Sequence, residues 1–282
     1  MLSRLLKYDF RALTRILLPL QGGVLIAALI GSLLVRLARA SFDIWNDGML
    51  ASSAAGDVIG STSVLLSFLL FAAVFASYWI TLFLIARHYY QSFLKDEGYL
   101  TFTLPVSTGQ NLLSKVIAGS IWLLVNVVIL ILAFILLFVV GYDDSALGGF
   151  SLFSSDAGQS TSGVLDFVSA VELFVLGLLL VIHGVLQVYV SITMGAVIAQ
   201  THKVLAGIGL FVGINIAMQL IMSILTFSLA NALSNSFSVY SQYDWFSAMQ
   251  VLVLPSLIIC GGLVVFYFVL SKRLLTKRLN LD

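Results

Sequence analysis

Polar side chains that recur at helical spacing inside long apolar runs are the first candidates for chemistry in this sequence. One run carries four of them on a single helix face, at Glu172, His183, Gln187 and Ser191. A second run carries another such stripe, at Asn215, Gln219, Ser223 and Thr226, and a third holds the isolated Asn126. These residues either form interhelical hydrogen bonds, worth roughly 0.6–2 kcal/mol each in a membrane, or line a translocation path. The two stripes leave both interpretations open, whereas packing is favoured for Asn126.

The constellations that catalysis requires are missing from the sequence. It contains no G-x-x-x-x-G-K-[ST] phosphate loop, no H-E-x-x-H, no C-x-x-C and no G-x-S-x-G. The three histidines, His88, His183 and His202, lie in separate segments, and Cys260 is the one cysteine. We therefore expect no catalytic residue, metal site or cofactor in this chain, and a stand-alone enzyme is disfavoured.

The composition predicts the fold class. The chain has 282 residues, 60% of them hydrophobic and 10% charged, whereas a soluble domain has about 25% charged residues. The apolar runs are about 20 residues or longer and do not alternate with period two, so they predict spanning helices and exclude a barrel. We expect a single all-α integral membrane domain over residues 1–282 with six transmembrane helices, at 17–37, 63–86, 116–140, 167–199, 204–229 and 249–270.

A basic amphipathic segment precedes the first predicted span. Its four cations recur on one helix face over residues 1–16, at Arg4, Lys7, Arg11 and Arg15. This pattern predicts a helix lying along the membrane surface. Asp9 breaks the pattern because it projects from the apolar side. The segment is either a simple anchor or an elbow helix that also contacts a partner through Asp9.

The placement of charge predicts the orientation. With six spans, twelve Lys and Arg residues fall on the side of the two termini and two on the other side, at Arg36 and Arg39. Positive residues gather on the cytoplasmic side, so we expect both termini in the cytoplasm. The net charge of +1 indicates no nucleic-acid partner.

The segment 87–115 is the most information-dense part of the chain. It continues the second span, and Gly98 is placed to end that helix. Pro105 follows a stretch that alternates apolar residues with threonine, and Ser107 or Thr108 can cap the next helix. The pattern predicts a short, firm knuckle between two helices. Exposed Tyr99, Phe102 and Leu104 would either need a partner surface or belong to an ordinary cytoplasmic loop whose aromatic residues lie on the lipid headgroups.

This segment, DEGYLTFTLPVSTGQNLLSK, resembles the loop between the second and third spans of bacterial ABC type-2 permeases, in which a Leu-Pro-hydroxyl stretch precedes the third span and a Lys marks its inner end. Here those positions are Leu104, Pro105, Ser107 and Lys115. The opening SRLLKYDFRAL is similar to the elbow helix of such permeases. The resemblance covers the whole chain in topology and is sharp over about residues 87–115.

The resemblance implies a coupling loop docked on a separate ATP-binding subunit, which would hold ATP and Mg. Its implied contacts are Asp96, Glu97, Gly98, Tyr99, Thr101, Phe102 and Leu104, and the turn at Thr201, His202 and Lys203 is a second candidate contact. It also implies a second permease chain, identical or related, and the inner membrane of a bacterium. Family members often have a re-entrant segment between the fifth and sixth spans, which residues 231–247 are too short to establish.

The predicted function is therefore the membrane subunit of an ATP-driven exporter. The apolar walls with scattered amides favour an amphipathic or hydrophobic substrate such as a peptide, lipid or drug-like molecule. Two alternatives remain: an ATP-independent channel or ion-coupled carrier that uses the two polar stripes, and a membrane scaffold or immunity protein that transports nothing.

Overall fold

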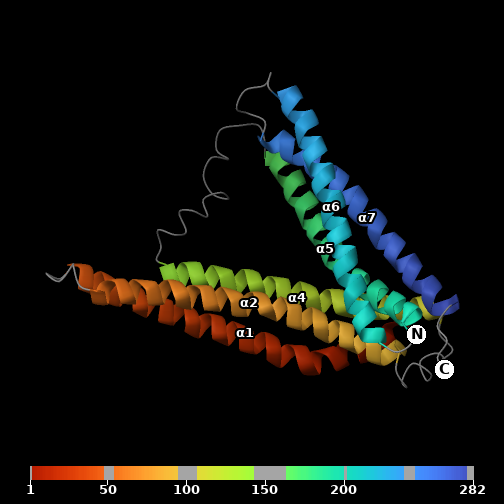
Figure 1. Cartoon of the computed structure of the whole chain (residues 1–282), viewed down its shortest axis with the longest axis horizontal. Coiled ribbons are helices and arrows are strands. Elements are labelled where there is room, and N and C mark those ends of the chain that lie inside the picture. Colours follow the sequence, from red (N-terminus) through yellow and green to blue (C-terminus); the bar gives the residue numbers. More distant parts are fainter. Residues whose placement is uncertain are drawn as a thin grey trace. The chain divides into compact units, whose positions relative to one another are not determined.

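Six long helices make up the described part of the chain. The computed structural model describes residues 2–47, 54–94, 107–142, 163–199, 202–237 and 245–277, and all of these except Ser107, Ala199 and His202 are α-helical. The helices are α1 (Leu2–Asp47), α2 (Ala54–Leu94), α4 (Thr108–Tyr142), α5 (Gly163–Ile198), α6 (Lys203–Phe237) and α7 (Trp245–Lys277) (Figure 1). Each contains a segment long and apolar enough to cross a membrane. The predicted all-α fold with six membrane-spanning helices is confirmed.

The helices are longer than the apolar runs that predicted them. The connection expected over residues 38–62 is largely helical, since α1 continues to Asp47 and α2 begins at Ala54. No glycine or proline occurs between Gly31 and Gly48, so nothing in the backbone chemistry ends α1 earlier. Hydropathy marks the part of a helix that suits lipid, whereas the hydrogen-bond ladder continues until a residue breaks it.

The expected surface helix at residues 1–16 is not a separate element. It forms the first turns of α1, and Pro19 lies inside that helix rather than in its first turn. The predicted faces are nevertheless present, because Arg4, Lys7, Arg11 and Arg15 are exposed while Asp9 and Leu13 are buried. The expectation that Asp9 projects from the apolar side is confirmed.

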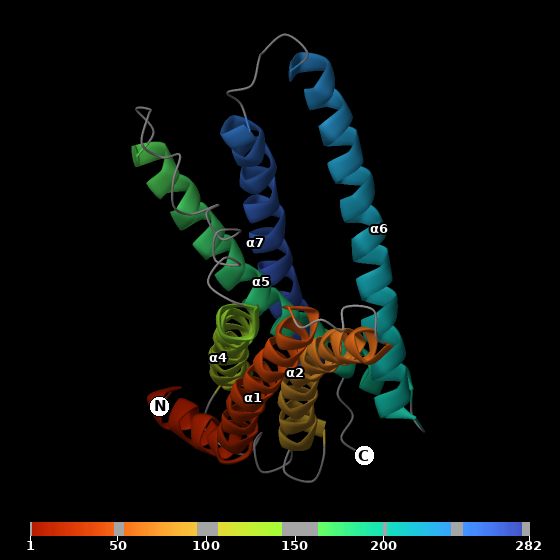
Figure 2. The same cartoon turned by 90° about the vertical axis from the view of Figure 1, so that its left-hand side faces the viewer.

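The described residues form two compact units, and α1, α2 and α4 each pass through both. Of the described residues, the first unit contains 2–9, 85–94, 107–120, 163–199, 202–237 and 245–277, and the second contains 10–47, 54–84 and 121–142. In the second unit α1, α2 and α4 run side by side (Figure 2). Their core takes two residues from each helix: Ala28 and Val35, Leu70 and Val74, Ala133 and Leu137.

In the first unit α5 packs against both α6 and α7. A Cβ added to Gly195 would lie 2.6 Å from the Cα of Gly207, so the absence of a side chain is what lets α5 and α6 cross closely. α5 and α7 run in the same direction and α6 runs against them (Figure 1).

Candidate functional site

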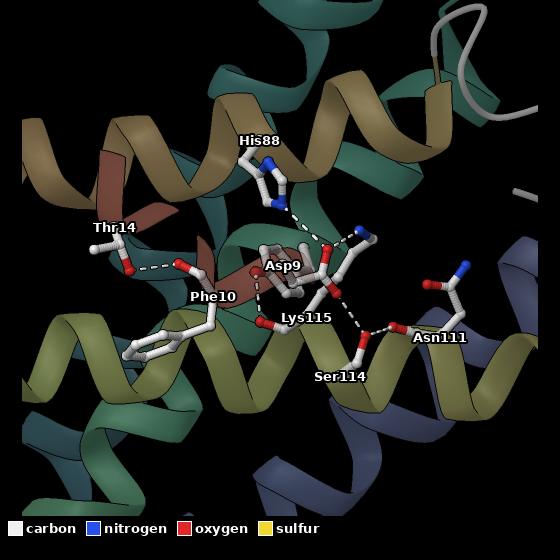
Figure 3. Close-up of polar contacts among 8 residues, drawn as sticks. Asp9, Phe10, Thr14, His88, Asn111, Ser114 and Lys115 are labelled. Atoms are coloured by element: carbon white, nitrogen blue, oxygen red, sulfur yellow. Dashed lines mark hydrogen bonds and ion pairs between the residues drawn. The ribbon is translucent and has the colours of Figure 1, made fainter. Parts of the chain in front are cut away.

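A buried ion pair joins the start of α1 to the start of α4. The Lys115 ammonium donates to Asp9 Oδ1 at 2.8 Å, and the two side chains are only 5% and 11% exposed. His88 Nε2, from α2, lies 3.3 Å from the same oxygen, and since a carboxylate only accepts, Nε2 carries the hydrogen. The Ser114 hydroxyl donates to Asp9 Oδ2 at 2.7 Å (Figure 3). Both carboxylate oxygens are therefore satisfied.

Lys115 also contacts an aromatic ring. Its Nζ lies 5.4 Å from the centre of the Phe93 ring, in the last turn of α2. A cation placed over an aromatic face is attracted by the ring quadrupole. Lys115, a residue of α4, thus contacts α1 through Asp9 and α2 through Phe93.

A pair of stacked tyrosines connects the same region to α5. The rings of Tyr89 and Tyr189 are parallel within 10°, with their centres 3.9 Å apart. The Tyr189 hydroxyl donates to the backbone carbonyl of Lys115 at 3.2 Å, and the Thr193 hydroxyl donates to the Tyr189 carbonyl. A Cβ at Gly119 would lie 3.0 Å from the Tyr189 hydroxyl, so glycine at this position admits the ring.

We call Asp9, His88, Ser114, Lys115, Tyr89 and Tyr189 the hub. All six lie in the first unit. The hub fixes four helix segments to one another: the start of α1, the end of α2, the start of α4 and the last third of α5. The end of α2 and the start of α4 flank residues 95–106 in the sequence, so the hub residues of these two helices fall within the segment 87–115 that the sequence singles out.

A second polar cluster lies in the other unit and contains no charge. The Asn126 amide nitrogen donates to Gln21 Oε1 at 3.1 Å and to Thr81 Oγ1 at 3.2 Å. The Gln21 amide donates to Thr81 Oγ1, also at 3.2 Å. Asn126 and Thr81 are fully buried and Gln21 is 4% exposed. These bonds join α1, α2 and α4, in line with the packing role expected for Asn126.

The structure places the two predicted polar stripes in different surroundings. On α5, Gln187 and Ser191 are buried, and the His183 ring centre lies 5.3 Å from that of Tyr267 on α7. On α6, Asn215, Gln219 and Ser223 are exposed. The Asn215 amide and the Ser223 hydroxyl donate to backbone carbonyls of α6 itself. The described residues therefore do not bring the two stripes together.

The predicted partner contacts fall mainly outside the described residues. Asp96, Glu97, Gly98, Tyr99, Thr101, Phe102 and Leu104 all lie there, as does Thr201. His202 is exposed and its carbonyl accepts from the Ala206 amide at 3.0 Å, while Lys203 begins α6. These contacts stay predictions.

Sequence reasoning missed most of the hub. His88, Ser114, Tyr89 and Tyr189 received no role, and Lys115 was identified only as the marker of the inner membrane face. One signal was available: Asp9 interrupts an apolar face, and a carboxylate that is buried needs a cation. Which cation it meets depends on how helices distant in sequence pack, and that information is not local.

Taken together, the six apolar helices make this chain a multi-pass membrane protein. Among the described residues no group of three or more His, Cys, Asp or Glu is placed to hold a metal ion. Comparison with known families, with characterised proteins and with solved structures finds no match.

Proposed function

We propose that this chain is the membrane-spanning subunit of an ATP-driven exporter, powered by separate ATPase subunits that contact residues 95–106. The observation that carries the proposal is the hub. A loop that transmits force needs flanking helices that move together, and the two helices flanking this loop are tied by Lys115, which is bonded to Asp9 and seated over Phe93.

The hub also connects the helix ends that flank residues 95–106 to α5. The stack of Tyr89 on Tyr189, together with the hydrogen bond from Tyr189 to the Lys115 carbonyl, links these helix ends to α5. Packed cores transmit displacement because they are close-packed and poorly compressible. A push on the loop would thus shift α2, α4 and α5 as a group.

The orientation required by the proposal rests on the distribution of charge. Twelve of the fourteen Lys and Arg residues fall on the side predicted to be cytoplasmic, and the resemblance of residues 87–115 to a coupling loop agrees with that side. The chain has no phosphate loop of its own, so the ATPase is a different chain. ATP and Mg belong to that partner.

Co-purification tests the proposal. Tagged protein from its native host should retain an ATP-binding subunit, and the double substitution Glu97→Arg with Phe102→Ala should abolish that retention. The matched control makes a similar chemical change between the third and fourth predicted spans, Asp156→Arg with Phe153→Ala, and should leave retention intact. Absence of any ATPase subunit from the unmodified complex would refute the proposal.

A further inference from the structure

Three buried polar atoms on the packed helices α5 and α7 have no hydrogen-bond partner in the described part of the chain. They are Nε2 of His183, Nε2 of Gln187 and Oγ of Ser271. Gln187 is 5% exposed and Ser271 is fully buried. Buried polar groups are almost always hydrogen-bonded, so three exceptions in one helix contact require an explanation.

Helical spacing places the three residues along one contact between α5 and α7 in the first unit. His183 contacts Tyr267 across the helices, with ring centres 5.3 Å apart. Gln187 and Ser271 each follow that contact by four residues, which is about 6 Å along a helix. Because α5 and α7 run in the same direction (Figures 1 and 2), both steps lead the same way. We call His183, Gln187, Tyr267 and Ser271 the α5–α7 seam.

The chemistry of the seam favours a bound group that accepts hydrogen bonds. The Gln187 amide nitrogen can only donate, the Ser271 hydroxyl can donate, and His183 Nε2 donates when it carries the hydrogen. α7 contains no Asp or Glu. On α5 the nearest is Glu172, eleven residues before His183, or about 16 Å along the helix. The seam therefore suits an oxygen acceptor, and α5 and α7 supply no carboxylate near it to hold a cation.

The burial pattern places the seam at an edge that lipid can reach. No residue of α5 from Val171 to Gly184 is buried, whereas every residue from Val185 to Ser191 is. Large apolar side chains beside the seam are exposed, including Leu180 at 54% and Phe266 at 58%. A molecule whose acceptor reached the seam could keep an apolar chain against these side chains.

We propose that the α5–α7 seam binds the acceptor oxygens of a long-chain carboxylic acid or its ester. Gln187 and Ser271 donate to the carbonyl or carboxylate oxygens, and the hydrocarbon chain stays at the lipid-facing surface. This inference rests on the proposed function only in identifying the bound molecule as the substrate class, since binding itself requires no ATPase.

Photo-crosslinking of the purified full chain in nanodiscs tests the inference. The probes are a diazirine-labelled palmitic acid, its methyl ester and the corresponding alkylamine, each competed with unlabelled palmitic acid. We expect the acid or both oxygen-bearing probes to label α5 and α7 peptides that contain the seam, and the amine to leave them unlabelled. Labelling by the ester as well as the acid identifies a carbonyl contact, and labelling by the acid alone identifies a carboxylate contact.

Two variants and a matched control test whether Gln187 and Ser271 donate the hydrogen bonds to the bound molecule. Gln187→Leu and Ser271→Ala each remove one donor, and loss of a neutral hydrogen bond weakens binding by about two- to tenfold. Ser191→Ala is the control, because Ser191 is equally buried on the same face and its hydroxyl already donates to the Gln187 carbonyl at 2.7 Å. The control should bind as the unmodified protein does.

The melting temperature provides the second measurement. Gln187→Leu removes an unsatisfied buried donor, so the ligand-free variant should melt no lower than the unmodified protein while losing the increase that palmitic acid produces. Equal labelling by acid and amine, or unchanged labelling in both donor variants, overturns the inference. Loss of labelling in Ser191→Ala to the same extent also overturns it. Since ATPase retention is scored separately, a failure here is distinguishable from a failure of the proposed function.

Discussion

Removing the cation of the buried ion pair should destabilise the protein strongly. In Lys115→Met the Asp9 carboxylate, 11% exposed, keeps only Ser114 and His88 as partners. Breaking a buried pair by removing one member typically costs about 3–5 kcal/mol, because the remaining charge is left uncompensated. Asp9→Asn should cost a similar amount, since it leaves the Lys115 ammonium buried without a negative charge to compensate it.

The double variant distinguishes the interaction between Asp9 and Lys115 from the separate effect of each substitution. Asp9→Asn with Lys115→Met leaves no buried charge, so its cost should fall below the sum of the two single costs by at least about 2 kcal/mol. The free energy of unfolding can be measured by denaturing the protein in mixed micelles with increasing SDS, followed by circular dichroism.

Lys7→Met is the matched control for this cycle. Lys7 lies on α1 near Asp9 but is exposed, and an exposed substitution changes stability by less than about 0.5 kcal/mol. Single-variant costs that simply add in the double variant would refute the claim that Asp9 and Lys115 interact. A control as costly as Lys115→Met would show that loss of any cation, rather than of the pair, is responsible.

Two further predictions concern close packing and the uncharged cluster. Gly195→Ala should lower the melting temperature, because its Cβ would meet the backbone of Gly207, whereas Gly209→Ala, with nothing within 4 Å of the added Cβ, should not; equal melting temperatures would contradict the close α5–α6 crossing. Asn126→Leu should lower the free energy of unfolding by about 0.6–2 kcal/mol, since it removes the donor that joins α1, α2 and α4. Asn215→Leu, at an exposed position, should change it little, and a cost equal to that of Asn126→Leu would contradict the cluster.

The number and type of the helices could be predicted from sequence because lipid constrains both. A spanning backbone must satisfy its own hydrogen bonds, so each long apolar run implies one helix. The ends were less predictable: α1 continues to Asp47 and α6 to Phe237, beyond the hydrophobic part of each run. Polar residues do not by themselves end a helix, and the composition of residues 38–47 carried no stop signal.

The hub and the seam could be predicted only in part. Asp9 was singled out because it interrupts an apolar face, and His183 and Gln187 because they are polar within a span. Tyr267 and Ser271 were not predicted to lie beside them, since Tyr267 falls in the apolar run 249–270 and Ser271 just after it. A periodic pattern specifies the face on which a residue lies but not the helix that covers that face. The stripe on α6 shows the same limit, because its spacing predicted one shared face but no helix of the described structure covers that face.

The positions of the two polar clusters follow from the cost of burying charge. Asn126 lies eleven residues beyond Lys115 on α4, about 16 Å deeper along the helix. At that depth the cluster uses only amides and hydroxyls, whose transfer into lipid costs far less than that of an ion. Lys115 and Asp9 lie near helix starts, where a charge pair is tolerable and its geometry is specific. A charged pair defines one register between α1 and α4, and that register sets the positions of the helix ends that flank residues 95–106. Among the described residues, the buried charge pair therefore lies where the relative positions of α2 and α4 matter most to the proposed coupling.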